Sequence, residues 1–144
     1  QGNDRAQVKG IFEGLCDIAI INNYYFGKLK YSEDPIQREW AKSMRLTFPN
    51  QGEGDRGAHI NISGGGIAKY SKNKKAAQKL LEFLSGKKSQ KMYSEINFEY
   101  PVNIKVQPSE ELISWGSFRE DKISVEKIAQ LSIEAQKIID KVGW

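Results

Sequence analysis

The chain has 144 residues, of which 39% are hydrophobic and 28% are charged, and its net charge is +4 at pH 7. This composition excludes general disorder, and the length suits one domain or two halves of something larger. No run of about eighteen apolar residues is present, which excludes a membrane-spanning helix. One cysteine excludes an internal disulfide, and lysines scattered among acids permit but do not specify acidic partners.

Helices and strands are expected to alternate along the chain. Asn3 and Asp4 can cap a first helix that ends near Gly14. The apolar run 17–21 is typical of a central parallel strand that is covered on both faces. Pro35 is expected to open the next helix. Further strands are expected at 45–49 and 59–63, a glycine-rich loop at 50–57, and helices at 74–86, 88–96, 109–115 and 125–142.

The stretch CDIAIINNYYFGKLK, residues 16–30, places two adjacent tyrosines where an apolar run ends. On their own, adjacent aromatic residues at a strand end are more often packing groups than ligands. However, ligands of open α/β sheets gather at the carboxyl ends of parallel strands, and a turn into a helix lets neighbouring side chains share one crevice. Tyr24 and Tyr25, the tyrosine pair, are therefore candidates to converge on one small ligand.

The other residues that carry chemistry favour structural roles. The glycines at 64–66 lack the lysine and the spacing of a phosphate-binding loop, and His59 has no partner at metal-ligand spacing. No pattern supplies a base for Ser63, which disfavours an enzyme. A basic nucleic-acid-binding module, using the lysines at 69–75 and 87–91, is the least favoured interpretation.

Two phenols side by side suit a hard metal ion. A phenol has a pKa near ~10 and binds well only when a hard, highly charged cation displaces its proton. Fe(III) is the natural candidate, since hard oxygen donors select hard cations. Lys28 lies one turn beyond Tyr24 if this segment is helical, and it can help to balance the phenolate charge. The alternative is an organic or anionic solute, with the tyrosines as cleft walls.

Long stretches of the chain carry a family resemblance. They are GNDRAQVKGIFEGLCDIAIINNYYFGKL, FPNQGEGDRGAHINISGGGIAKYSKNKKAAQKLLEFLSG, EINFEYPVN and the closing VGW. Together they resemble the second half of periplasmic ferric iron-binding proteins. These are the substrate-binding components of iron(III) ABC transporters, called ferric-binding or Fut-type proteins, in the bacterial transferrin branch. The tyrosine pair after DIAIINN is the most specific element of the resemblance.

The resemblance implies an α/β chain that forms the C-terminal part of a class II, two-lobe periplasmic-binding-protein fold. In that family tandem tyrosines bind Fe(III), and Tyr24 and Tyr25 match them. Asn22 matches a position that in some members helps to hold a synergistic carbonate or phosphate, whereas Fut-type members can use a further tyrosine instead. The implied role is not enzymatic: it is capture of Fe(III) in the periplasm and delivery to an ABC permease in the inner membrane, without nucleic acid.

The resemblance also implies how the chain divides. Residues 1–50 are expected to belong to the second lobe, and residues 51–144 to return to the first lobe and add C-terminal helices, with the N-terminal half absent. The chain alone is therefore expected to hold Fe(III) weakly, and self-association through uncovered apolar surface is a further expectation. Cys16 is expected either to pair with a cysteine in the other half or to be a buried free thiol.

Overall fold

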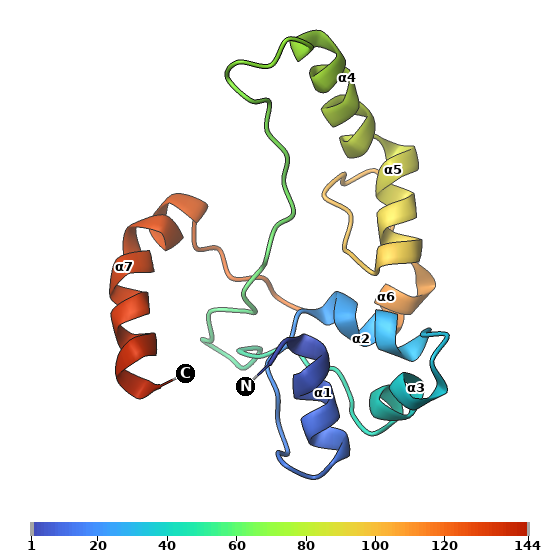
Figure 1. Cartoon of the computed structure of the whole chain (residues 1–144), viewed down its shortest axis with the longest axis vertical. Coiled ribbons are helices and arrows are strands. Elements are labelled where there is room, and N and C mark those ends of the chain that lie inside the picture. The colour runs from blue at the N-terminus through green and yellow to red at the C-terminus, as the bar shows by residue number, and fades with distance from the viewer. Residues whose placement is uncertain (1, 144) are drawn as a thin grey trace. The chain divides into compact units, whose positions relative to one another are not determined.

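The computed structural model describes residues 2–143, which form helices joined by long irregular segments (Figure 1). Within this range the only β pairing is an isolated parallel bridge between Ala58 and Glu120. The elements in chain order are α1 (Asp4–Phe12), α2 (Asn23–Lys30), α3 (Pro35–Lys42), α4 (Lys74–Ser85), α5 (Lys87–Met92), the π-helical η1 (Tyr93–Asn97), α6 (Glu110–Ser114) and α7 (Val125–Val142).

Local capping signals explain where several helices begin. Asn3 accepts a hydrogen bond from the backbone N–H of Ala6 at 3.1 Å, as the sequence predicts for the first helix. Asp34 caps α3 in the same way, with Pro35 at its first position. The predicted long helix at 125–142 is confirmed as α7. The helix predicted at 88–96 is divided between α5 and η1.

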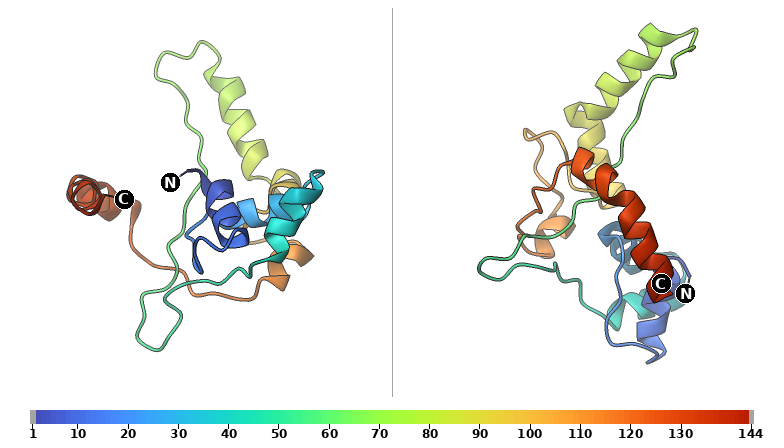
Figure 2. Two further views of the ribbon diagram at one scale, coloured as in Figure 1. Left: turned by 60° about the horizontal axis from the view of Figure 1, so that its bottom comes forward. Right: turned by 90° about the vertical axis from the view of Figure 1, so that its left-hand side faces the viewer.

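The chain divides into two compact units, of which the first comprises 1–47 and 61–117 and the second 48–60 and 118–144. In the first unit α1, α2 and α3 pack together, as both views of Figure 2 show. Val8, Leu29 and Ala41, one from each helix, are buried at their centre. The partly buried side chains that pack against this core are Ile21, Phe26, Trp40 and Met44.

The expectation of strands is wrong for the described residues. The run 17–21 is irregular, and Ile18 and Ile20 are 84% and 77% exposed, so no strand covered on both faces forms here. Segments 45–49 and 59–63 are also irregular. A β-branched apolar run indicates a preference for a sheet, but a strand forms only if neighbours pair with its backbone groups. The described residues supply no such neighbour, so the α/β expectation is replaced here by a helix-rich chain.

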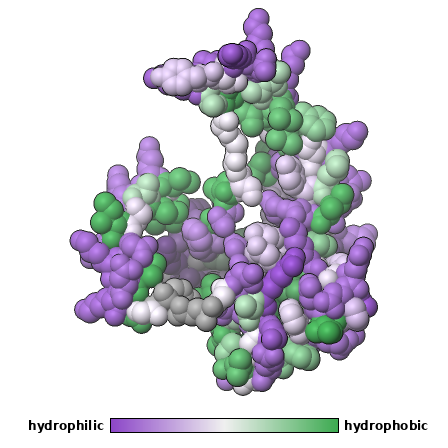
Figure 3. Space-filling view, viewed as in Figure 1, coloured by the Kyte–Doolittle hydropathy of each residue, from purple (hydrophilic) through white to green (hydrophobic). Residues whose placement is uncertain are grey.

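The second unit is a loop and a terminal helix. The predicted glycine-rich loop is present, and the Arg119 guanidinium donates to the carbonyl oxygens of Gly52 and Asp55 at 2.8 and 2.9 Å. Phe48 stacks on Phe118 with ring centroids 4.2 Å apart. α7 has no buried residue, and Figure 3 shows hydrophobic side chains open on its surface. No helix among the described residues is long and apolar enough to cross a membrane.

Candidate functional site

The tyrosine pair lies in the first turn of α2, directly after an extended segment. The two ring centroids are 4.4 Å apart and the ring planes are inclined by 33°. Adjacent side chains in a helix normally point about 100° apart. Here the two rings are instead in tilted contact, which places the phenols side by side. The structure thus brings together the two residues that the sequence singles out, although a helix start replaces the expected strand end.

The phenol of Tyr24 loses its proton less readily than an ordinary tyrosine, because its pKa is raised. Hydrogen bonding with Tyr25 is the main influence that raises the pKa of Tyr24 to about 12. Burial and electrostatic interactions with Tyr25, Asp4 and Glu99 contribute smaller parts of the same rise. The phenol is therefore protonated at neutral pH in the free protein, and a ligand that needs the phenolate must displace the proton.

Lys28 lies where the sequence expects it. Its Nζ atom is 4.9 Å from the centroid of the Tyr24 ring, one helical turn further along α2. At this distance the ammonium group and the ring form a cation–π contact. The contact brings one positive charge next to the tyrosine pair, where it can offset part of a phenolate charge.

Asn22, the residue before α2, is held by other residues of the chain. Its backbone N–H and its Nδ2 both donate to Oδ1 of Asp4, at 2.7 and 3.2 Å. Its Oδ1 accepts a hydrogen bond from Nδ2 of Asn61 at 3.0 Å. These bonds join α1, the start of α2 and the segment after residue 60.

Glu99 is a second carboxylate near the tyrosine pair, and it acts on Tyr24 electrostatically. Ser63 donates a hydrogen bond from Oγ to Oε2 of Glu99 at 3.1 Å, and Nδ2 of Asn97 donates to Oε1. Sequence reasoning missed Glu99, Asp4 and Asn61 as members of this site. The local sequence indicates only that Asp4 lies at the start of a helix. Asn61 and Glu99 lie far from the tyrosine pair along the chain, so no local pattern indicates that they belong to this site.

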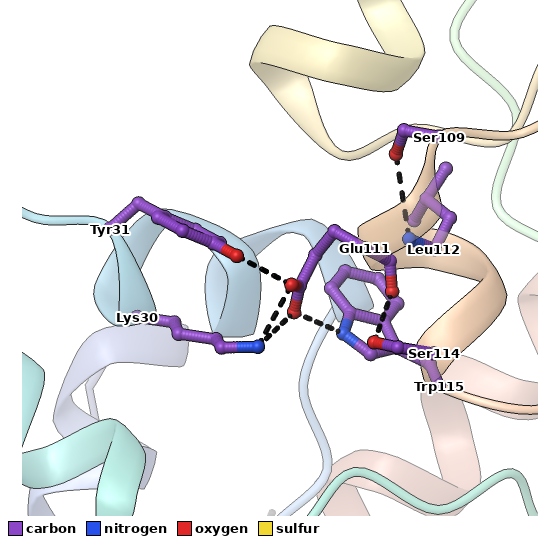
Figure 4. A network of polar contacts seen from close by, with 7 residues as sticks. All are labelled: Lys30, Tyr31, Ser109, Glu111, Leu112, Ser114 and Trp115. Atoms are coloured by element: carbon purple, nitrogen blue, oxygen red, sulfur yellow. Dashed lines mark hydrogen bonds and ion pairs between the residues drawn. The ribbon is translucent and has the colours of Figure 1, made fainter.

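The C-terminal end of α2 is fixed by Glu111 of α6 (Figure 4). Lys30 Nζ donates to Oε1 and Oε2 of Glu111 at 2.6 and 2.8 Å, and the Tyr31 hydroxyl donates to Oε2 at 2.6 Å. Trp115 Nε1 donates to Oε1 at 2.8 Å. Burial alone would raise the pKa of Glu111, but the three donors outweigh burial and lower it.

The middle of α2 is in close contact with Phe98. A Cβ atom on Gly27 would lie 2.6 and 2.8 Å from Cδ2 and Cδ1 of the Phe98 ring, so only glycine lets this ring approach the helix. The ring also stacks on Tyr31, with centroids 5.4 Å apart and planes inclined by 10°. Phe98 itself has a left-handed backbone, with φ of 59°. The helix of the tyrosine pair is therefore held at its start, middle and end.

Other candidate residues form no comparable group. The described residues contain no cluster of three or more His, Cys, Asp and Glu side chains that could hold a metal ion. His59 is exposed, and the structural role that the sequence favours stays a prediction. Cys16 is a free thiol in this chain and is partly buried, and its pairing with a residue outside the chain stays a prediction.

The whole chain, including the tyrosine pair, is similar to proteins that are already known. No protein-family model matches the chain. Over 144 residues the chain is 40% identical to Iron uptake protein A1 of Synechocystis, and it covers 39% of that protein. The chain therefore spans well under half the length of this curated relative.

Two solved structures resemble the chain throughout. A ferric binding protein from Campylobacter jejuni matches 99% of the chain, with 43% identity and a TM-score of 0.91, over 45% of its own length. A Trichodesmium protein (IdiA, FutA), solved in complex with iron and citrate ligands, matches 100% of the chain with 42% identity and a TM-score of 0.90, over 45% of its length. Along its whole length, the chain is thus a homologue of part of the iron uptake and ferric iron-binding proteins.

Proposed function

We propose that this chain contributes the tyrosine pair to an Fe(III) site in a solute-binding protein of an iron(III) ABC transporter. The observation that carries the proposal is the contact of the two phenol rings, with centroids 4.4 Å apart, in the first turn of α2. The relatives named as iron uptake and ferric iron-binding proteins support the metal assignment. The role is capture and delivery to an inner-membrane permease, and it is not catalysis.

Binding of Fe(III) replaces the phenolic protons. Each tyrosine of the pair loses a proton to water as its oxygen bonds the metal, and the hard cation supplies the driving force. The raised pKa of Tyr24 makes this exchange unfavourable at neutral pH until the metal is present. Iron binding is therefore expected to release protons and to strengthen as the pH rises through the neutral range.

The tyrosine pair fills only part of the coordination sphere. Fe(III) takes about six hard donors, and the described residues contain no cluster of three or more His, Cys, Asp and Glu side chains that could supply the rest. We therefore place the other ligands in a second part of a two-lobe protein, which closes on the ion around a hinge. In this proposal residues 1–50 belong mainly to the second lobe, and residues 51–144 return to the first lobe and add C-terminal helices.

The proposed location is the periplasm. One relative, from Serratia marcescens, is named as an Fe(3+)-binding periplasmic protein and is 27% identical over 135 residues. The chain covers only 38% of that relative, so location and permease belong to the proposal for the whole protein.

The test is a titration of the full-length protein with ferric citrate, followed through the visible phenolate-to-Fe(III) charge-transfer band. Tyr24→Phe and Tyr25→Phe should each weaken binding and shift or bleach this band. Tyr70→Phe is the matched control, since Tyr70 is 85% exposed and contacts Lys69. Unchanged affinity and spectrum in both site variants would remove the tyrosine pair from the metal site. Tight binding of an organic solute without a band would favour cleft walls instead.

A further inference from the structure

The donors of Asn22 are already bound to a carboxylate of the chain. We infer that Asp4 supplies the negative charge at this position and that the iron site takes no separate carbonate or phosphate on Asn22. This inference rests on the proposed function, since it concerns the charge balance of the same iron site. It opposes the expectation, taken from the family resemblance, that Asn22 helps to hold a synergistic anion.

Both hydrogen-bond donors of Asn22 that could hold an external anion already bind Asp4. The backbone N–H and Nδ2 of Asn22 converge on one oxygen, Oδ1 of Asp4, at 2.7 and 3.2 Å. Two donors that meet on one carboxylate oxygen are the arrangement by which a small oxyanion would be held. An incoming anion would have to displace Asp4 and leave that carboxylate without these donors.

Asn61 fixes the orientation of the Asn22 amide. It donates from Nδ2 to Oδ1 of Asn22 at 3.0 Å, so the amide oxygen faces Asn61 and the amide nitrogen faces Asp4. Rotation of the amide to serve another ligand would break both bonds. The hydrogen bonds with Asn61 and Asp4 together keep the amide nitrogen of Asn22 directed at Asp4.

The position of Asp4 is also favourable for a carboxylate. Asn22 is the N-cap residue of the eight-residue α2, and its side chain makes no capping bond to the helix. The start of a helix attracts negative charge because its first N–H groups point outward. Asp4 accepts from the N–H of this N-cap residue, so a side chain of the chain takes the anion's place at the start of the tyrosine helix.

The charges near the tyrosine pair further oppose an added anion. Asp4 and Glu99 both act electrostatically on Tyr24, and Lys28 is the cation in contact with its ring. Two phenolates cancel two of the three charges of Fe(III), and the carboxylate of Asp4 can cancel the third. A carbonate or phosphate would add negative charge beside two carboxylates, which is unfavourable.

One buried donor near the pair lacks a partner. Nδ2 of Asn23 is buried without a hydrogen bond. An anion held there would make iron binding by the wild-type protein depend on anions, so the experiment below includes this outcome.

The experiment compares Fe(III) binding by the full-length protein in buffer free of carbonate and phosphate with binding after either anion is added. For the wild-type protein, the affinity and the charge-transfer band should not change. Asp4→Asn keeps the shape of the side chain but removes its charge, so it should make binding depend on the anion. The expected rise in affinity on adding the anion is about fivefold or more, within the usual range of coupling between two ligands.

A second readout does not depend on iron affinity. Phosphorus-31 and carbon-13 NMR of the iron-loaded protein should show no bound phosphate or labelled carbonate in the wild type, and a bound anion in Asp4→Asn. Asp17→Asn is the control, because it removes the same charge from an exposed residue of the first unit.

The outcomes separate the two proposals. Binding by the wild-type protein that requires either anion, or a bound anion in its NMR spectrum, overturns the inference but leaves the iron site intact. An Asp4→Asn protein that remains indifferent to anions removes Asp4 from the proposed role. Absence of any charge-transfer band under all conditions contradicts the proposed function itself. The wild-type comparison needs no variant, so it decides even if Asp4→Asn fails to fold.

Discussion

Helices α2 and α7 are stabilised in opposite ways. α7 has its own start and stop signals: Ser124 caps it through the N–H of Lys127, and Gly143 ends it with φ of 69°, yet none of its residues is buried. α2 has eight residues, no side-chain cap and a glycine within it. Its buried Leu29, the ring of Phe98 and the carboxylate of Glu111 hold it in place.

This difference shows where a candidate site depends on the rest of the protein. Glycine lowers helix propensity, and a helix as short as α2 is marginal in water. The orientation of the tyrosine pair is therefore set by contacts with α1, α6 and the segment around residue 98. Substitutions in α2 and its supports should disturb the unit as a whole, whereas substitutions in α7 should change only that helix.

The largest difference is expected for leucine truncation. Leu29 is fully buried, so Leu29→Ala should lower the free energy of unfolding by about 2–5 kcal/mol through lost burial and a cavity. Leu131 in α7 is 44% exposed, and Leu131→Ala should cost about 0.5 kcal/mol or less. Guanidinium unfolding followed by circular dichroism measures both. Equal costs would contradict the comparison.

The contact between α2 and Phe98 gives the next effect. Gly27→Ala places a methyl group against the Phe98 ring, so the ring or the helix must move. Overpacking of this kind costs about 1–3 kcal/mol, and it outweighs the gain in helix propensity from alanine. The loss should appear in the same unfolding measurement.

Gly64→Ala is the matched control for Gly27. A Cβ at Gly64 would meet no atom within 4 Å, and its φ lies outside the left-handed region. We expect this variant to change stability by at most about 0.5 kcal/mol. A stable Gly27→Ala protein with an unchanged near-ultraviolet spectrum would show that the ring does not rest on the helix in solution.

The same contrast explains what the sequence could predict. The bounds of α7, the cap at Asn3 and the start of α3 at Pro35 follow from residues a few positions apart, and these predictions are confirmed. The proposed strand at 17–21 failed because strand formation depends on partners elsewhere, which a local pattern does not report.

The candidate site divides in the same way. Tyr24, Tyr25, Asn22 and Lys28 are close in sequence, so a local motif could single them out. Their surroundings come from distant residues: Asp4 lies 18 positions before Asn22, and Asn61 lies 39 positions after it. Only folding brings these groups together, so the charge balance at the tyrosine pair could not be read from the sequence.

Loss of the Glu111 charge should have an intermediate effect. Glu111→Gln keeps the size of the side chain but weakens its bonds with Lys30 and Tyr31. Hydrogen bonds to a charged group contribute about 1.5–3 kcal/mol, and the partial exposure of Lys30 reduces the expected loss to about 1–2 kcal/mol. Unfolding at neutral pH measures the difference from wild type.

The pH dependence provides the control for Glu111. Its pKa in the folded chain is lowered from the ordinary value of 4.5, so its contribution is complete above that pH and is lost as the pH falls through the lowered pKa. The stability difference between wild type and Glu111→Gln should therefore shrink under acidic conditions. A difference that does not depend on pH would mean that the carboxylate charge plays no part.

The smallest effect is expected at the start of α7. Ser124 accepts a hydrogen bond from the N–H of Lys127 at 3.1 Å, and Ser124→Ala removes this cap at a cost of about 1 kcal/mol. Because α7 has no buried residue, the loss should appear as faster amide exchange within α7 and lower helicity, while the core around Leu29 keeps its protection.

Ser132→Ala separates the cap from a general effect of serine. Ser132 lies inside α7 and donates from Oγ to the carbonyl oxygen of Ala129 at 2.8 Å, so it caps nothing. Alanine has the higher helix propensity, and this variant should slow amide exchange in α7 or leave it unchanged. Faster amide exchange throughout both units after Ser124→Ala would mean that α7 is coupled to the rest of the fold. Exchange equal to wild type would show that the helix does not depend on its cap.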